Sequence, residues 1–243
     1  MALLKADRGL VDELVRQYES NLERVELALA QLRTLVEKNS ELRALYHSLK
    51  WRTKDPSHLR DKLLRKLKES RDSGLDFPIS GANLFARIND LAGLRILHIH
   101  THQIEQINDC LKRMFDEAMY QLIEGPIAKT WDDESRRYFA AVGIQTEDSA
   151  TLYTSVHYVI QVNTRTPLTV EIQVRTLMEE VWGEVDHAIN YPEPTHFLAC
   201  REQIAALARA TSACTRLVDS IFASHGDAML TGRKLKDSKR RVP

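Results

Sequence analysis

A strict alternation of apolar and polar residues in segment 170–176 predicts a β-strand. The apolar positions are Val170, Ile172 and Val174, and the polar positions between them are Glu171, Gln173 and Arg175. Because side chains alternate along a strand, one face would be buried and the other would present an acid, an amide and a guanidinium. Such a face is typical of a functional site. A strand at the edge of a sheet, with its charges in water, shows the same pattern.

A second segment, residues 153–162, is rich in β-formers and predicts a neighbouring strand. The residues between the two segments, 163–167, are turn-like, so we expect an antiparallel hairpin. Its first strand would carry Tyr153, Ser155 and His157 on one face, next to the polar face of segment 170–176. Thr176 then caps a helix that is predicted to run to about residue 190.

The motif D-L-A-G-L-R at residues 90–95 leads into another predicted strand, residues 93–100. Residues 102–119 have apolar side chains at three- and four-residue spacing and predict a helix. A strand followed by a helix indicates a layered arrangement of sheet and helices. Residues 125–152 are mixed and polar, and we expect a long loop there that closes over a ligand.

Cations gather in segment 48–66. Lys50, Arg52 and Lys54 alternate just before Pro56, which disfavours helix at the residue before it, so an extended backbone would aim all three to one side. A helix is predicted to begin at Pro56. It would carry Lys62, Arg65 and Lys66 close to one face, which adds to these cations. A row of cations suits phosphate binding, and the alternative is a solvated basic helix.

Composition narrows the class of protein. Lys plus Arg and Asp plus Glu both total 34, so no excess charge indicates a nucleic-acid or membrane partner. The cysteines, Cys110, Cys200 and Cys214, are odd in number and far apart, which fits a reducing cytosol. No apolar run approaches the roughly 18 residues of a membrane span. We therefore expect a cytoplasmic protein.

Amphipathic helices are predicted near both ends, at residues 8–46 and 197–222. Each apolar stripe would pack on the sheet or on another subunit, so a homo-oligomer is one of two alternatives. The expected organisation is a helical region at 1–47, a core at 48–195, a helix that packs on the core or a partner at 196–225, and a flexible basic tail at 226–243.

Together these motifs resemble the synthetase domain of the RelA/SpoT superfamily, the nucleotide pyrophosphokinases that make the alarmones pppGpp and ppGpp. D-L-A-G-L-R is followed by Y-T-S-V-H at 153–157, V-E-I-Q-V-R-T at 170–176 and a W…D-H…Y pattern that ends at Tyr191. The combination is more specific than any one motif. It implies an α+β fold with a central mixed, largely antiparallel β-sheet flanked by helices, and with long helices at both ends.

The resemblance also implies roles for single residues. Asp90 and Glu171 would bind Mg²⁺, and Glu171 would take the proton from the 3′-hydroxyl of the acceptor, GDP or GTP. Arg52 and Arg95 would stack on the adenine of the donor, ATP. The donor phosphates would be held by Lys54, Lys62 and Arg65, with Lys50 and Lys66 beside them. The acceptor site would consist of Tyr153, Ser155, His157, Gln173 and Arg175, with Tyr153 stacking on the acceptor base.

One position departs from the family pattern, which commonly has Gly before the Tyr of Y-x-S-x-H. Here that residue is Leu152, so the identity of the acceptor is left undecided. An adenine nucleotide or the 3′ CCA end of tRNA is an alternative, and Arg136, Arg137 and the basic tail would favour tRNA. Such a toxic synthetase would have an antitoxin as its partner.

A third alternative is a module that binds nucleotides without turnover. The histidine and aspartate cluster of the hydrolase domain is not found, so the chain is not expected to degrade its product.

Overall fold

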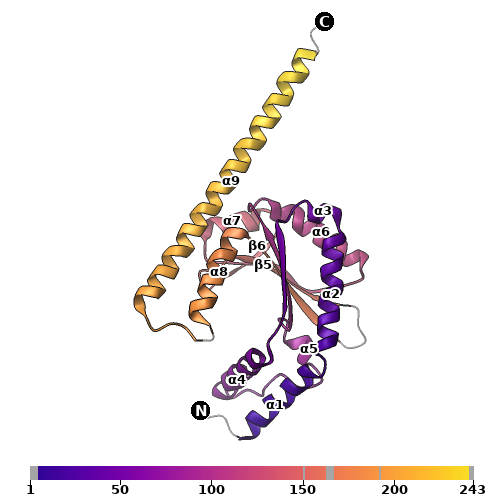
Figure 1. Cartoon of the computed structure of the whole chain (residues 1–243), viewed down its shortest axis with the longest axis vertical. Helices are drawn as coiled ribbons and strands as arrows, with labels where there is room; N and C mark the ends of the chain where they lie inside the picture. Colours follow the sequence, from indigo (N-terminus) through magenta and orange to yellow (C-terminus); the bar gives the residue numbers. More distant parts are fainter. Residues whose placement is uncertain (1–4, 150, 163–166, 192, 241–243) are drawn as a thin grey trace.

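The computed structural model describes residues 5–149, 151–162, 167–191 and 193–240, with side chains described from Asp7 to Gly226 within these ranges. Over these residues the chain forms one six-stranded sheet with helices on both faces (Figure 1). The predicted α+β fold with a mixed central sheet is confirmed. In the part of the chain that is described, no helix is long and apolar enough to span a bilayer.

The strands are β1 (Ser48–Thr53), β2 (Ala92–His98), β3 (Gln121–Thr130), β4 (Gln145–Asp148), β5 (Ser155–Gln161) and β6 (Thr169–Thr176). The helices are α1 (Lys5–Glu19), α2 (Leu22–Lys38), α3 (Ser40–Arg43), α4 (Pro56–Asp72), α5 (Leu84–Arg87), α6 (Gln103–Glu117), α7 (Asp133–Ala141), α8 (Leu177–Asn190) and α9 (Leu198–Arg240).

The last strand in the chain, β6, lies in the middle of the sheet, whose order is β1-β2-β6-β5-β3-β4. β5 and β6 are antiparallel, as the predicted hairpin requires, although most of its turn lies outside the described residues. β2 and β6 are parallel neighbours, with Gly93 opposite Glu171 and Arg95 opposite Gln173. The parallel pairing therefore brings the motif at 90–95 beside segment 170–176.

The two faces of the sheet differ in polarity. On the face that α2 and α6 cover, Leu94, Tyr158 and Ile172 are completely buried. α8 and α9 lie over the opposite face (Figure 1), where the strands carry Arg95 and Gln173. Segment 170–176 thus buries its apolar positions in the core and directs its polar positions toward α8, so it is not an edge strand with its charges in water.

The prediction of a long loop at residues 125–152 is wrong, because this segment contains most of β3, all of α7 and all of β4. Asp132 begins α7 by accepting hydrogen bonds from the backbone N–H groups of Glu134 and Ser135. β3 pairs with β5 through two irregularities in register near Gly125. Ladder hydrogen bonds and a capped helix therefore replace the loop.

The terminal helices are confirmed, and α9 is longer than predicted. Its backbone continues to Arg240, through the segment expected to be a flexible tail, and Figure 1 shows it extending well beyond the sheet. α1 packs against α4 and α8 against α9. The division of the chain into four regions stays a prediction.

Candidate active site

A hollow of about 260 Å³ lies over the polar face of the sheet, between β1, β2, β6 and α8. Strand register arranges its floor in two rows. One row runs Arg52–Gly93–Glu171, and the next runs Lys50–Arg95–Gln173. The alternation of β1 thus points Lys50 and Arg52 to one side, as predicted, and that side faces α8.

Gly93 forms the floor at the centre of the first row. A Cβ atom built on it would meet no other atom within 4 Å, so the hollow opens directly above the backbone of β2. The Gly of D-L-A-G-L-R therefore provides space above the sheet, because its backbone needs no special conformation. A flat group can lie against the sheet here, between Arg52 and Glu171.

A second hollow of about 420 Å³ lies between α4, the end of β1 and the last turn of α8. It shares Arg52, Asp90 and His187 with the first hollow, so the two are neighbouring ends of one cleft. Its α4 wall carries Lys62 and Arg65. The cleft therefore has a flat-floored end over the sheet and a cationic end beside α4.

Asp90 is held by two lysines. Lys54 Nζ lies 2.8 Å from Oδ2 and Lys62 Nζ lies 2.7 Å from Oδ1. Burial would raise the pKa of Asp90, but the charges of Lys62 and Lys54 hold it below its ordinary value. Asp90 is therefore a carboxylate at neutral pH, and its two ammonium partners already stand at the cationic end of the cleft.

Glu171 is oriented from two sides. The Nδ1 atom of His157 lies 3.0 Å from its Oε1, and the side-chain amide of Gln173 donates to its Oε2 at 2.9 Å. Burial would raise the pKa of Glu171, and the charge of Asp90 acts in the same direction, but the contacts with His157 and Gln173 keep it below the ordinary value. Asp90 and Glu171 line the same hollow, which explains why the charge of Asp90 affects the pKa of Glu171.

Gln173 connects three predicted site residues. Its side-chain oxygen accepts hydrogen bonds from Nε of Arg95 and from the hydroxyl of Tyr153, at 3.3 and 3.2 Å, while its amide nitrogen holds Glu171. An amide can do this because it presents an acceptor and donors at the same time. The guanidinium of Arg95, the hydroxyl of Tyr153 and the carboxylate of Glu171 are thus fixed by one side chain.

The sequence model described as "Region found in RelA / SpoT proteins" matches residues 51–196, which include α8 and every residue of the two floor rows except Lys50. The chain belongs to the RelA/SpoT family. No curated protein sequence matches it.

Solved structures with the same fold agree with this membership. Small alarmone synthetase 1 from Bacillus subtilis, bound to its product pppGpp, is 20% identical with a TM-score of 0.53, covering 90% of this chain and 97% of that one. A GTP pyrophosphokinase family protein from Streptococcus pneumoniae is 18% identical with a TM-score of 0.62, covering 87% and 93%. Small alarmone synthetase 2 from Bacillus subtilis is 18% identical with a TM-score of 0.58, covering 86% and 98%. At such identities the likeness establishes the fold.

In this RelA/SpoT family member, two acids of α8 form ion pairs with Lys50 and Arg95, a feature that sequence reasoning missed. Lys50 Nζ lies 2.8 Å from Glu180, and Arg95 lies 3.0 Å from Glu184 and 3.3 Å from Glu180. These hydrogen bonds lie at the edge of the Arg95 guanidinium, so its planar faces remain suited to stacking. Glu180 and Glu184 are four residues apart on one helix. Because the same spacing is common on solvated helices, the sequence did not distinguish these acids as part of the site.

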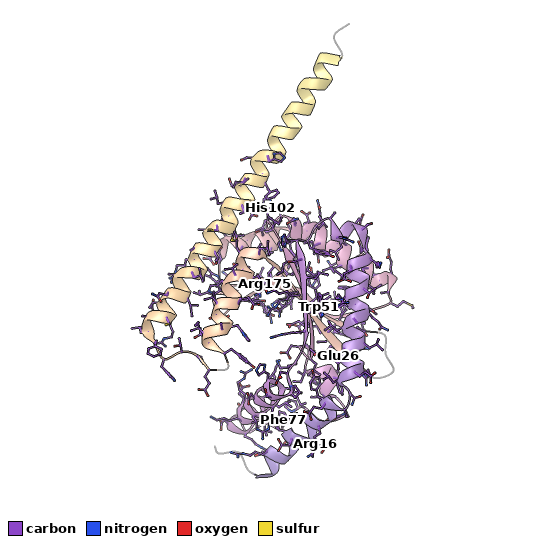
Figure 2. All side chains as sticks on the ribbon, viewed as in Figure 1. Arg16, Glu26, Trp51, Phe77, His102 and Arg175 are labelled. Atoms are coloured by element: carbon purple, nitrogen blue, oxygen red, sulfur yellow. The ribbon has the colours of Figure 1, made fainter. Side chains whose placement is uncertain are left out.

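Arg175 lines neither hollow of the cleft, and its guanidinium carbon lies over the Tyr153 ring, 5.3 Å from the ring centroid. It is 3% exposed, forms a buried ion pair with Glu180 and lies inside the body beside α8 (Figure 2). A Cβ on Gly183 would come within 2.7 Å of its guanidinium, so the helix approaches closely here. Arg175 therefore supports Glu180, and through it Lys50 and Arg95.

Ser155 and Tyr153 are also engaged internally. Ser155 is 1% exposed and donates to the carbonyl of Val174, which leaves it no free surface for an acceptor. The Tyr153 ring packs with Trp182 in a small cluster that also includes Leu152. The unusual Leu152 thus anchors the segment before β5 against α8 and α9, and the predicted acceptor platform is partly covered.

Two other cations lie apart from the cleft. Lys66 borders a separate hollow with Pro78 and Arg87, so it does not join the other predicted phosphate ligands. Arg136 is paired with Asp133 and Asp148, so two carboxylates balance the charge of this one residue.

Proposed function

We propose that this protein is a small alarmone synthetase that transfers the β,γ-pyrophosphate of ATP to the 3′-hydroxyl of GDP or GTP. One observation carries the proposal: two carboxylates, Asp90 and Glu171, share a cleft with a flat-floored end and a cationic end. Membership of the RelA/SpoT family and the alarmone synthetases among its structural neighbours support it.

The donor fits the cleft in one direction. The adenine would lie above Gly93, against Arg52 and Arg95, and the triphosphate would point to Lys54, Lys62 and Arg65 beside α4. Phosphoryl transfer depends mainly on positioning and on cations that spread the charge of the phosphates. Because Lys54 and Lys62 already bind Asp90, donor phosphates would recruit ammonium groups that are in place.

Glu171 is the proposed general base. It would take the proton of the acceptor 3′-hydroxyl as that oxygen bonds to the β-phosphorus, while the bond from the β-phosphorus to the α,β-bridging oxygen breaks and AMP leaves with the electron pair. His157 and Gln173 would keep the carboxylate aimed at the hydroxyl. Its lowered pKa keeps it deprotonated near pH 7.

The two carboxylates of the cleft suit Mg²⁺. Asp90 and Glu171 offer hard oxygen ligands, and no group of three or more His, Cys, Asp or Glu residues is arranged to hold a metal among the described residues. Mg²⁺ commonly uses one or two carboxylates and completes its shell with water and substrate phosphates. When bound, it would neutralise charge on the transferred group.

An acceptor screen tests the reaction. Labelled ATP with Mg²⁺ and each of GDP, GTP, GMP, ADP, ATP and deacylated tRNA should give a 3′-pyrophosphorylated product with GDP or GTP. A product with tRNA or an adenine nucleotide alone would assign the alternative acceptor, and no product with any acceptor would favour a binding module.

The variant Glu171→Gln tests the base. It should lower kcat by about 10²–10⁴-fold while binding of a non-hydrolysable ATP analogue persists. The matched control is Glu147→Gln, the same change at an exposed position of β4 away from the cleft, which should leave kcat unchanged. Unchanged turnover in Glu171→Gln would refute the role.

A further inference from the structure

His187 stands where the two ends of the cleft meet. Of the three residues that line both hollows, Arg52 and Asp90 have proposed roles in the reaction, and His187 is the third. It lies in the last turn of α8, on the face that also carries Glu184. Any nucleotide that extends from the flat floor to the α4 cations must pass this imidazole.

A chain of ring contacts holds His187 in place. Its ring stacks on Tyr191 with centroids 4.5 Å apart and planes 12° apart. Tyr191 in turn meets His58 edge to face, at 4.7 Å and 75°. Because His58 lies in the first turn of α4, the three rings connect the α8 wall of the cleft to the α4 wall.

The surroundings of His187 favour an uncharged ring. Burial, and then the charge of Arg52, lower its pKa below the ordinary value. A neutral imidazole keeps one N–H donor and adds no positive charge to a wall that already holds Arg52 and Lys62. Such a donor can bind a phosphate oxygen without repelling the neighbouring cations.

We propose that His187 contacts the donor nucleotide where its ribose joins the triphosphate, by donating a hydrogen bond to a phosphate oxygen. Tyr191 and His58 are positioning residues that act through His187 and tie α8 to α4. The inference rests on the proposed function, because it takes ATP as the molecule that spans the two hollows. It adds a donor-binding residue from α8 to those of β1, β2 and α4.

The deciding variant is His187→Phe, which keeps a ring to stack on Tyr191 and removes the N–H donor. Calorimetric titration with a non-hydrolysable ATP analogue should show binding about tenfold weaker than in the wild type, since a hydrogen bond to a charged group is lost. His187→Gln, which retains an N–H donor, should recover part of the affinity. The control is His196→Ala, an exposed histidine that lines neither hollow.

Tyr191 tests the positioning role. Tyr191→Phe should bind the analogue like the wild type, because the ring is retained, whereas Tyr191→Leu should weaken binding less than His187→Phe does. The double variant His187→Phe/Tyr191→Leu should be no weaker than His187→Phe alone, since Tyr191 acts through His187. Additive losses would overturn that assignment.

The outcomes separate the inference from the function it rests on. If the wild type binds the ATP analogue and His187→Phe binds it equally well, His187 is not a donor contact, and the proposed function stands. If the wild type binds no ATP analogue, the proposed function itself is wrong. Thermal melts of each variant establish that the folded protein is being measured.

Discussion

The proposed donor half and the proposed acceptor half of the candidate site are built differently. The donor half, on β1, β2, α4 and the inner face of α8, presents cations around an open cleft. The acceptor half, residues 153–157 with Arg175, is locked into hydrogen bonds, ring contacts and a buried ion pair. We therefore expect substitutions in the donor half to affect mainly nucleotide binding, and substitutions in the acceptor half to affect mainly the free energy of unfolding.

The largest effect on stability is expected from Arg175→Met. Arg175 and Glu180 are both buried, and removing one member of a buried ion pair typically costs about 3–5 kcal/mol. Urea unfolding should therefore show a loss of about 3 kcal/mol. The matched change Arg65→Met, at a side chain that is 69% exposed, should stay within about 0.5 kcal/mol. Equal losses in both variants would contradict the comparison.

A pH effect comes next, at Glu179. This residue is 6% exposed and accepts the backbone N–H of Thr154; burial raises its pKa from 4.5 to about 7. Because the folded state holds this proton more tightly than the unfolded state, stability is lost as pH rises from about 4.5 through 7. The loss is at most about 3 kcal/mol, from 2.5 pKa units at about 1.36 kcal/mol each.

The variant Glu179→Gln should remove that pH dependence. The wild type should lose about 2.5 kcal/mol of unfolding free energy between pH 5 and pH 8 through this group, and Glu179→Gln should not show that loss. Glu147→Gln, on the exposed edge strand, should keep the wild-type profile. A profile for Glu179→Gln that matches the wild type would show that the group titrates normally.

The smallest change in the free energy of unfolding is expected from Gly93→Val. Its main effect should be on nucleotide binding, in the donor half. A side chain at this position meets nothing within 4 Å and suits a strand, so the unfolding free energy should change little. It would fill the floor of the cleft and should weaken binding of an ATP analogue about tenfold. Gly9→Ala, equally free of close atoms but on α1, is the control. Full affinity in Gly93→Val would show that the nucleotide does not lie on β2.

The strands that build the site could be predicted from the sequence because their periodicity is strong. The polar residues of segment 170–176 share one face and Lys50 and Arg52 of β1 point to one side, as expected, and the structure places α8 over both. β3 could not be predicted, because Gly125 and Pro126 interrupt its pattern as turn residues do. The structure explains Gly125: a Cβ there would lie 2.3 Å from the carbonyl oxygen of His157, and its φ is +97°.

The roles on the acceptor side depend on what covers the sheet, which a single sequence does not contain. Ser155 and Arg175 alternate correctly with the apolar positions, but α8 and α9 bury them. In the same way, the spacing of Glu180 and Glu184 says nothing about which side of α8 meets Lys50 and Arg95. Both features are set by the packing of α8 between the sheet and α9.

The central place of β6 has a consequence for the order in which a ribosome can complete this protein. Asp90 and Glu171 are 81 positions apart, so at about 5–20 residues per second the second acid follows the first by roughly 4–16 s. Until β6 emerges, β2 and β5 lack the neighbour that joins them. For most of that interval the nascent chain presents the unpaired edge of β2, and the edge of β5 joins it only near the end, because β5 ends at Gln161. A chaperone that shields such edges would act before the candidate site is complete.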